Sequence, residues 1–228
     1  MEAIQLQDVV KISVRQLVEF ALREGDIESG FMGSNRAQEG VALHKKIQSK
    51  YPTHAKAEVS LAMDFPTEDV IVRVEGRADG LFEEPDGYMI DEIKSTTTPL
   101  HLIEADSYPL HFAQAEFYAY IFAIQNGQTT MKVQLTYIHL ETEQIKTLIR
   151  TYTLEELRQC TDRAIQAYLP FARFSLGWNQ CRNASLRASQ FPFPGYREGQ
   201  RELAITAYRA IKGQKKCFVM APTGIGKT

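Results

Sequence analysis

Two neighbouring stretches of the chain read VIVRVEGRADGLF (70–82) and GYMIDEIKS (87–95). Both are rich in β-branched and apolar residues, and the Glu-Pro-Asp-Gly sequence that separates them is typical of a turn. They predict two strands that follow one another in the fold. The segment EVSLAMDF (58–65), set off by another turn sequence, Pro-Thr-Glu-Asp, predicts a third strand before them.

Helical patterns lie on both sides of these strands. Apolar residues recur at helical spacing in four segments: 13–23, 36–51, 109–125 and 153–170. Ser13 is a plausible N-cap for the first, and Asn126-Gly127 ends the third. Two further strands are predicted at 131–141 and 144–152. The succession of helices and strands predicts an α/β domain.

The composition is that of a folded protein, because 44% of the 228 residues are hydrophobic and 24% are charged. Apolar runs stay well short of the roughly 18 residues of a membrane span. The N-terminus lacks the basic and apolar segments of a signal peptide. We therefore expect a cytoplasmic protein with no membrane partner.

The three cysteines exclude several kinds of site. Cys160, Cys181 and Cys217 contain no CxxC pair, which argues against a zinc knuckle or a disulfide framework. An iron–sulfur cluster held by four thiolates is excluded within this chain because it needs one more cysteine.

The charge is unevenly distributed along the chain. Residues 1–172 have 16 Lys and Arg against 26 Asp and Glu, a net of −10. Residues 173–217 have nine basic and two acidic residues, a net of +7. A basic segment suits contact with phosphate, although the same charge also fits an ordinary solvated surface.

Aromatic residues are interleaved with arginines in and beside this basic segment: Phe171, Phe174, Trp178, Phe191 and Phe193. Aromatic rings on a basic track suit the stacking of single-stranded nucleic acid. They equally suit the packing of a linker onto one of the domains.

A set of polar residues in the predicted strands suggests metal chemistry. Side chains alternate along a strand, so Glu92 and Lys94 share a face, and a neighbouring strand can bring Asp79 alongside them. Two carboxylates and an ammonium can hold Mg²⁺ or Mn²⁺ and position an attacking water. Each piece also has a structural explanation: an exposed strand face for Glu92-x-Lys94, and a turn for Asp79-Gly80.

The helices that flank the strands carry further polar residues. Gln114 and Tyr118 lie one turn apart and can simply share a helix face that packs against the core. His44 lies on an amphipathic helix, where a packing or surface role is the commoner explanation.

The order Gly40-x-x-x-His44, Gly76-x-x-Asp79, Glu92-x-Lys94 and Gln114-x-x-x-Tyr118 resembles the RecB-type branch of the PD-(D/E)xK nucleases. The resemblance implies a restriction-endonuclease-like fold, in which helices flank a mixed central sheet. It implies that Mg²⁺ or Mn²⁺ binds His44, Asp79, Glu92 and the backbone carbonyl of Ile93. It also implies that Lys94 is the catalytic lysine, and that Gln114 and Tyr118 support the site and contact DNA.

The end of the chain, APTGIGKT (221–228), fits a phosphate-binding P-loop. Glycines let backbone amides surround a phosphate, Lys227 supplies a cation, and Thr228 offers a hydroxyl to Mg²⁺. Such a loop follows a buried strand, which we expect at KKCFVM (215–220). The predicted ligand is ATP with Mg²⁺.

The elements before this loop add a second resemblance. Arg197, Gly199 and Gln200, a helix over 197–211 and the loop itself look like the start of the helicase core in the XPD/DinG family. The resemblance implies a truncated RecA-like P-loop domain. It implies nucleotide contacts from eight residues: Arg197, Gln200, Thr223, Gly224, Ile225, Gly226, Lys227 and Thr228. Because no later motor motif follows, we expect a fragment that does not hydrolyse ATP.

These features predict three parts: a nuclease domain at 1–172, a basic linker at 173–194, and the start of a helicase core at 195–228. The predicted activity is metal-dependent cleavage of DNA that is single-stranded or has a free end, as the exonuclease part of a helicase-nuclease in DNA repair. Two alternatives remain open. One is a structure-specific endonuclease, and the other is a catalytically inactive DNA-binding or interaction module.

Overall fold

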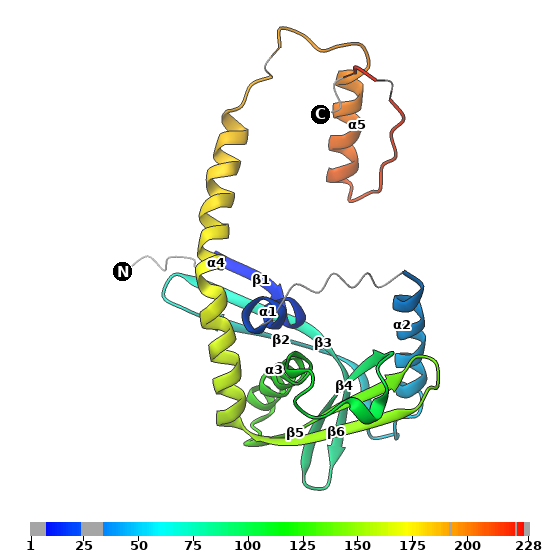
Figure 1. The fold of residues 1–228 in the computed structure, drawn as a ribbon. Helices are drawn as coiled ribbons and strands as arrows, with labels where there is room; N and C mark the ends of the chain where they lie inside the picture. The colour runs from blue at the N-terminus through cyan, green and yellow to red at the C-terminus, as the bar shows by residue number, and fades with distance from the viewer. Residues whose placement is uncertain (1–7, 24–33, 192, 222, 226–228) are drawn as a thin grey trace. The chain divides into compact units, whose positions relative to one another are not determined.

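The computed structural model describes residues 8–23, 34–191, 193–221 and 223–225 (Figure 1). By its internal contacts the chain divides into two units, Met1–Trp178 and Asn179–Thr228. No helix of the described residues is both long and apolar enough to cross a membrane.

The first unit is built on a mixed six-stranded sheet. Its strands are β1 (Asp8–Ser13), β2 (Lys56–Pro66), β3 (Val70–Glu84), β4 (Gly87–Thr96), β5 (Thr130–His139) and β6 (Ile145–Thr153). The spatial order is β1-β3-β4-β5-β6, and β2 also pairs with β3. The β1–β3 and β4–β5 pairs are parallel and the others are antiparallel.

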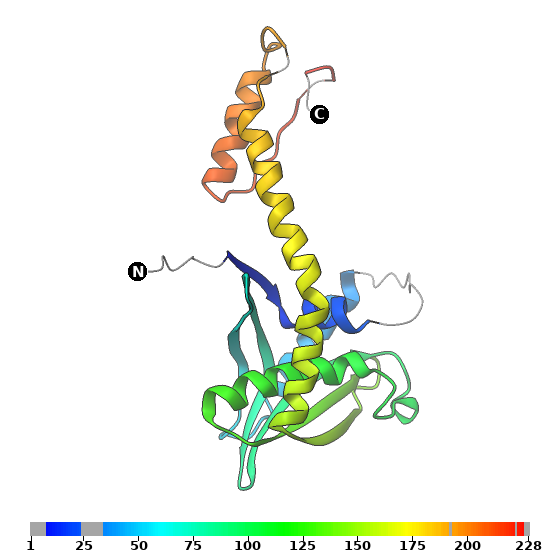
Figure 2. The same ribbon diagram turned by 90° about the vertical axis from the view of Figure 1, so that its left-hand side faces the viewer.

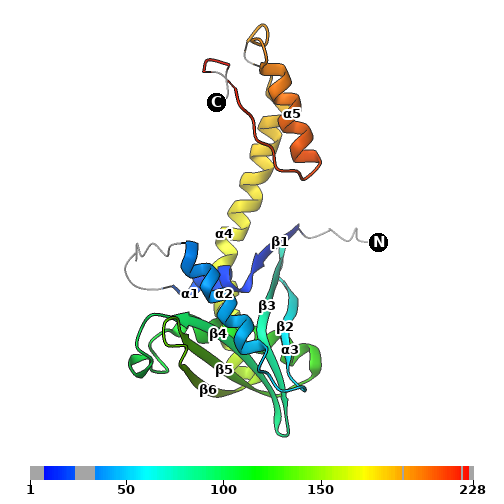
Figure 3. The same ribbon diagram turned by 90° about the vertical axis from the view of Figure 1, so that its right-hand side faces the viewer.

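Helices cover both faces of this sheet. They are α1 (Val14–Leu22), α2 (Ser34–Gln48), α3 (Pro109–Asn126) and α4 (Leu154–Ala188), with a short 3₁₀ helix at Leu100–Leu102. Figures 2 and 3 show α3 and the first part of α4 on one face and α2 on the other. The predicted fold class, an α/β domain whose mixed central sheet is flanked by helices, is confirmed.

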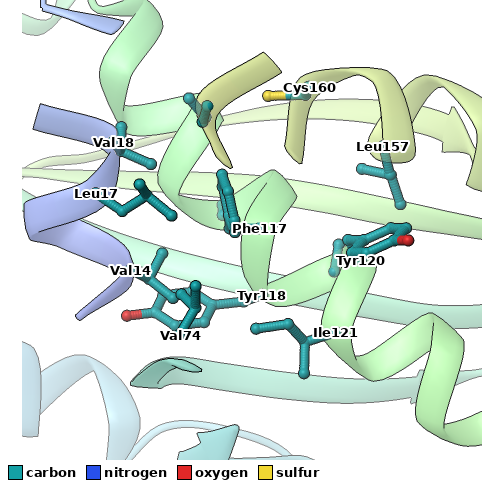
Figure 4. Packing of buried hydrophobic residues seen from close by; sticks show 14 of the residues in the cluster. Val14, Leu17, Val18, Val74, Phe117, Tyr118, Tyr120, Ile121, Leu157 and Cys160 are labelled. Atoms are coloured by element: carbon teal, nitrogen blue, oxygen red, sulfur yellow. The ribbon is translucent and has the colours of Figure 1, made fainter. Parts of the chain in front are cut away.

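The core explains why the middle of α3, from Phe117 to Ala123, is hydrophobic on all sides. Figure 4 shows its residues Phe117 and Ile121 between the sheet, α1 and α4, with Leu17 and Leu157 packed nearby. A helix enclosed in this way needs apolar residues around its whole circumference. A smaller cluster on the opposite face joins α2 to β4 and β5: Leu43, Ile47, Ile93 and Ile138.

The ends of several elements follow sequence signals. Ser13 caps α1 as predicted, accepting a hydrogen bond from the Gln16 amide at 3.2 Å. Gly127 ends α3 in a left-handed conformation, with φ of 64°. The strand β1 was not predicted from the sequence, because it is six residues long and its parallel partner in β3 lies about 60 residues later.

The helix predicted at 153–170 does not end at Pro170, because α4 continues to Ala188. Proline removes the hydrogen bond to the carbonyl four residues earlier. Pro170 and Gln166 are both exposed, so water can bind the carbonyl that proline leaves free. The helix therefore continues through the proline.

The second unit contains the helix α5 (Gln200–Lys212), which overlaps most of the helical segment predicted at 197–211. The expected buried strand at 215–220 is wrong, because this segment has no strand structure, and Phe218 and Met220 are almost fully exposed. A strand needs a partner to satisfy its backbone groups. The described residues of this unit contain no other strand to supply one.

Candidate active site

The candidate site lies where β3 and β4 separate. Their ladder reaches only to the Gly80–Asp91 pair. One residue beyond it, the Asp79 carboxylate replaces the strand partner and accepts a hydrogen bond from the Ile93 amide through Oδ2 at 2.8 Å. The side chain of Asp79 thus spans the opening between the strands and brings a carboxylate from β3 near Glu92.

Glu92 is a buried carboxylate, with only 4% of its surface exposed. Its Oε1 accepts hydrogen bonds from Lys94 Nζ at 2.8 Å and from Gln114 Nε2 at 2.7 Å. Its Oε2 is buried and has no hydrogen-bond partner. Burial raises the pKa of Glu92 to about 7, against the opposing effect of the Lys94 ammonium.

Lys94 and α3 form the second side of the site. Lys94 Nζ also donates to Gln114 Oε1 at 2.9 Å, so one amide side chain orients both the lysine and the glutamate. Tyr118 follows one turn later on α3 and is buried. Burial raises the pKa of Tyr118 to about 12.

A glycine on β3 makes room for Tyr118. A Cβ atom on Gly76 would lie 2.7 Å from the Tyr118 hydroxyl, which is too close for any other residue without movement. The Gly76-x-x-Asp79 spacing therefore has a physical basis: the glycine admits the tyrosine, and the aspartate bonds to β4.

His44 approaches from α2. Its Nδ1 lies 3.7 Å from Asp79 Oδ1, and both side chains are partly exposed. Gly40, one turn earlier, is buried against β4, because a Cβ there would lie 2.9 Å from Ser95 Oγ. The Gly40-x-x-x-His44 spacing thus lets α2 dock closely and place the imidazole beside Asp79.

Side chains on the opposite face of β4, away from Glu92 and Lys94, hold α2 in place. Asp91 is fully buried and accepts hydrogen bonds from Tyr51 Oη at 2.6 Å, Thr136 Oγ1 at 2.6 Å and Gln134 Nε2 at 3.2 Å. The side chain of Ile93 packs against α2 on this face. Asp91 therefore faces away from Lys94, as strand alternation predicts.

Sequence reasoning missed two residues of this region. Gln48 Nε2 donates to the Asp79 backbone carbonyl at 3.1 Å, and Tyr51 ties the end of α2 to Asp91. Gln48 lies four residues after His44, so it occupies the same helix face. That spacing was the only sequence signal, since Tyr51 lies beyond the end of the helix.

The residues present fit a divalent cation, although they do not form a ready-made cage. In the described part of the chain no three His, Cys, Asp or Glu side chains are arranged to hold an ion. The unpartnered Glu92 Oε2 is nevertheless a buried oxygen that needs a positive partner. Asp79 Oδ1 supplies a neighbouring carboxylate oxygen, the donor type that Mg²⁺ and Mn²⁺ prefer, and His44 Nδ1 places an imidazole nitrogen 3.7 Å from it.

Solved structures with a similar fold are known. The chain resembles SSO0001 with 20% identity and a TM-score of 0.47, covering 72% of this chain and 78% of that one. It resembles an alkaline exonuclease from Laribacter hongkongensis with 12% identity and a TM-score of 0.47, covering 77% and 94%. A phage-related exonuclease from Haemophilus somnus has 14% identity and a TM-score of 0.36, covering 68% and 76%.

No protein-family model and no curated protein matches the chain. At these identities and TM-scores, the chemistry of the site has to be argued from its own residues.

The predicted nucleotide-binding residues fall in the second unit, and only some are described. Arg197 Nη1 donates a hydrogen bond to the Gly224 carbonyl, and the Arg197 amide donates to Gln200 Oε1 at 3.1 Å. Thr223 and Ile225 lie in the same turn as Gly224. Gly226, Lys227 and Thr228 lie outside the described residues.

Proposed function

We propose that the first unit is a metal-dependent nuclease that hydrolyses phosphodiester bonds of DNA. Its substrate is DNA that is single-stranded or has a free end, and its action is exonucleolytic. The observation that carries the proposal is the state of Glu92: a buried carboxylate with one oxygen unpartnered and the other bonded to a lysine.

The unpartnered oxygen of Glu92 lowers the stability of the fold unless a ligand binds to it. A buried polar atom without a partner costs about 1–3 kcal/mol. An apolar residue at position 92 would avoid that penalty in a purely structural domain. A cation beside Glu92 Oε2 would relieve it.

Four groups of this chain would hold the metal: the side chains of His44, Asp79 and Glu92, and the carbonyl of Ile93. When bound, Mg²⁺ or Mn²⁺ neutralises charge on the scissile phosphate and makes a bound water more acidic. Gln114 keeps Lys94 beside this position, where the lysine can orient the attacking water as an ammonium or accept its proton as the uncharged amine. Tyr118, one turn after Gln114 on α3, would support the site and contact DNA.

The test is cleavage of end-labelled single-stranded and duplex DNA with Mg²⁺, with Mn²⁺ and with EDTA. Lys94→Ala is expected to lower the cleavage rate by at least about 100-fold, the usual scale of a lost proton-transfer group. Lys132→Ala is the matched control, because Lys132 also lies on the sheet and pairs with carboxylates, Glu84 and Asp86, away from the site. This control is expected to cut at the wild-type rate.

The products separate the alternatives. Mononucleotides released from an end identify an exonuclease, and internal cuts at branched or flapped DNA identify a structure-specific endonuclease. If the wild-type protein binds DNA but leaves it intact with either metal, the proposal fails and an inactive binding module is the better description. His44→Ala decides whether His44 is a ligand, because a purely structural histidine would leave the metal requirement unchanged.

We further infer that residues 195–228 begin an ATP-binding helicase motor that feeds DNA to the nuclease during DNA repair. The contact between Arg197 and the Gly224 carbonyl supports this, since it joins the two predicted nucleotide-binding segments within one unit. Binding of a fluorescent ATP analogue with Mg²⁺, compared between wild type and Lys227→Ala, tests the inference. Equal binding by both proteins would refute it.

A further inference from the structure

The face of α3 that carries Gln114 and Tyr118 extends one turn further toward the start of the helix. Residues three or four apart lie on one helix face. This spacing places Tyr108 at the N-cap and His111 in the first turn in line with Gln114 and Tyr118. The nuclease proposal uses the last two residues of this row and leaves the first two without a role.

Tyr137 of β5 connects these two residues to the strand that carries Lys94. Lys94 of β4 is the direct partner of Tyr137 in β5. The Tyr137 hydroxyl lies 2.9 Å from His111 Nδ1, within hydrogen-bond distance. Tyr137 thus neighbours Lys94 in the sheet and contacts His111, which stacks with Tyr108, and the Lys94 charge acts on the His111 imidazole.

Tyr108 and His111 form a stacked pair of rings. Their centroids are 5.1 Å apart and their planes are inclined by 24°. His111 is partly buried, whereas Tyr108 is 37% exposed. Tyr108 is thus an aromatic ring supported from behind and open to solvent at the edge of the site.

The charge state of His111 suits a flat, neutral ligand. Burial lowers the pKa of His111 to about 4, with smaller contributions from Lys94 and Arg15, so the imidazole is neutral at pH 7. A neutral ring stacked on a tyrosine offers a π-surface rather than a cation for phosphate. Base–aromatic stacking is a common way to hold a single strand without reading its sequence.

We propose that Tyr108, backed by His111, stacks against the nucleobase of the nucleotide next to the scissile phosphate. This subsite rests on the proposed nuclease function and specifies its substrate: a strand whose base at this position is unpaired. Tyr137 is a positioning residue, because it holds His111 and does not itself reach the surface, being 1% exposed.

The test is a cycle that combines protein variants with abasic substrates. Single-stranded oligonucleotides carry one abasic nucleotide, placed in turn at each position near the cleaved bond. Wild type is expected to lose about tenfold in kcat/KM at one position, the loss for one stacked base. Tyr108→Ala should lose the same factor on intact DNA and nothing more on that abasic substrate.

Two control variants test whether the effect is specific to the aromatic ring of Tyr108. Tyr108→Phe keeps the ring and loses only the hydroxyl, which lies 3.5 Å from Thr98 Oγ1. It should retain the tenfold loss at the abasic position that Tyr108→Ala abolishes. Leu102→Ala removes another side chain, 61% exposed, from the 3₁₀ helix that precedes α3. It should respond to the abasic substrates as wild type does. Equal thermal midpoints for all variants exclude unfolding as the cause.

A binding measurement separates this inference from the nuclease proposal. DNA with 2-aminopurine at the sensitive position, or at the strand end if no cleavage occurs, is mixed with protein in Ca²⁺. Stacking on wild type should quench the fluorescence, and Tyr108→Ala should not. The subsite would be overturned if Tyr108→Ala lowered kcat/KM by the same factor on intact and on abasic DNA, or if both proteins quenched the fluorescence equally. Either result would count against it even if cleavage itself is confirmed.

Discussion

Glu92 makes the ion-free protein sensitive to pH. Its pKa is about 7 in the fold, against 4.5 for an ordinary glutamate, because the side chain is buried. The unfolded chain therefore releases this proton at lower pH than the folded protein does. Stability contributed by the protonated group is complete below about pH 4.5 and is lost as the pH rises through about 7.

Glu92→Gln should remove this dependence. In EDTA, wild type is expected to lose about 1–3 kcal/mol more unfolding free energy than the variant between about pH 5 and pH 8. Urea unfolding of both proteins at the two pH values measures the difference. Parallel pH profiles would contradict a raised pKa for Glu92, and the variant should have no nuclease activity in either case.

Alanine substitutions at Gly76 and Gly177 should change the stability of the protein in opposite directions. Gly76→Ala forces a methyl group to within 2.7 Å of the Tyr118 hydroxyl, so we expect a loss of about 1–3 kcal/mol and of most cleavage activity. Gly177 lies inside α4 with open space around it, and Gly177→Ala should stabilise the helix by about 0.5–1 kcal/mol. Thermal unfolding of both variants, with activity assays, checks the two signs.

The sequence was sufficient to select the residues that meet in the site. The structure brings together the predicted set: His44, Asp79, Glu92, Lys94, Gln114 and Tyr118. Their proposed roles stay predictions. Gln48 had only its four-residue spacing from His44 as a signal, and Tyr51 had none, because a hydrogen bond to a buried aspartate from outside the helix follows no spacing in the sequence.

At the level of elements, the docking of α2 depends on Tyr51. Its hydroxyl donates to Asp91 at 2.6 Å and connects the end of α2 to β4. Tyr51→Phe removes this bond and should cost about 1–3 kcal/mol. Because α2 also carries His44, the metal concentration needed for half-maximal cleavage should rise, with a smaller change in the maximal rate.

This pattern distinguishes positioning from simple destabilisation. Leu43→Ala also weakens the packing of α2, within the apolar cluster of that face, and serves as the comparison. If both variants change the metal requirement in proportion to their loss of stability, Tyr51 has no specific role in positioning His44.

The elements that sequence reasoning misjudged share a cause. The strand β1 and the predicted strand at 215–220 both depend on partners distant in the chain, and only β1 has one among the described residues. The length of α4 depended on where Pro170 faces, which a sequence pattern does not show. Local propensity predicts an element only as far as its partners permit.

For the whole molecule, the first unit should fold without the second. Every buried hydrophobic side chain of the described residues lies between Val14 and Ala172. A chain ending at residue 190 should therefore keep the thermal midpoint of the 228-residue chain and, under the proposed function, its rate of DNA cleavage. Loss of cooperative unfolding on truncation would contradict this view. It would also contradict the predicted end of the nuclease domain at 172, because the domain would then need residues after 190.

The continuation of α4 past Pro170 has a consequence for amide hydrogen exchange. Its residues up to Ala172 include many that are buried against the core, whereas those from Gly177 to Ala188 are exposed throughout. Helical stability in water comes mainly from packing rather than from propensity. Within one unbroken helix, amides before the proline should be protected for as long as the core is, while those near Arg187 should exchange through local opening.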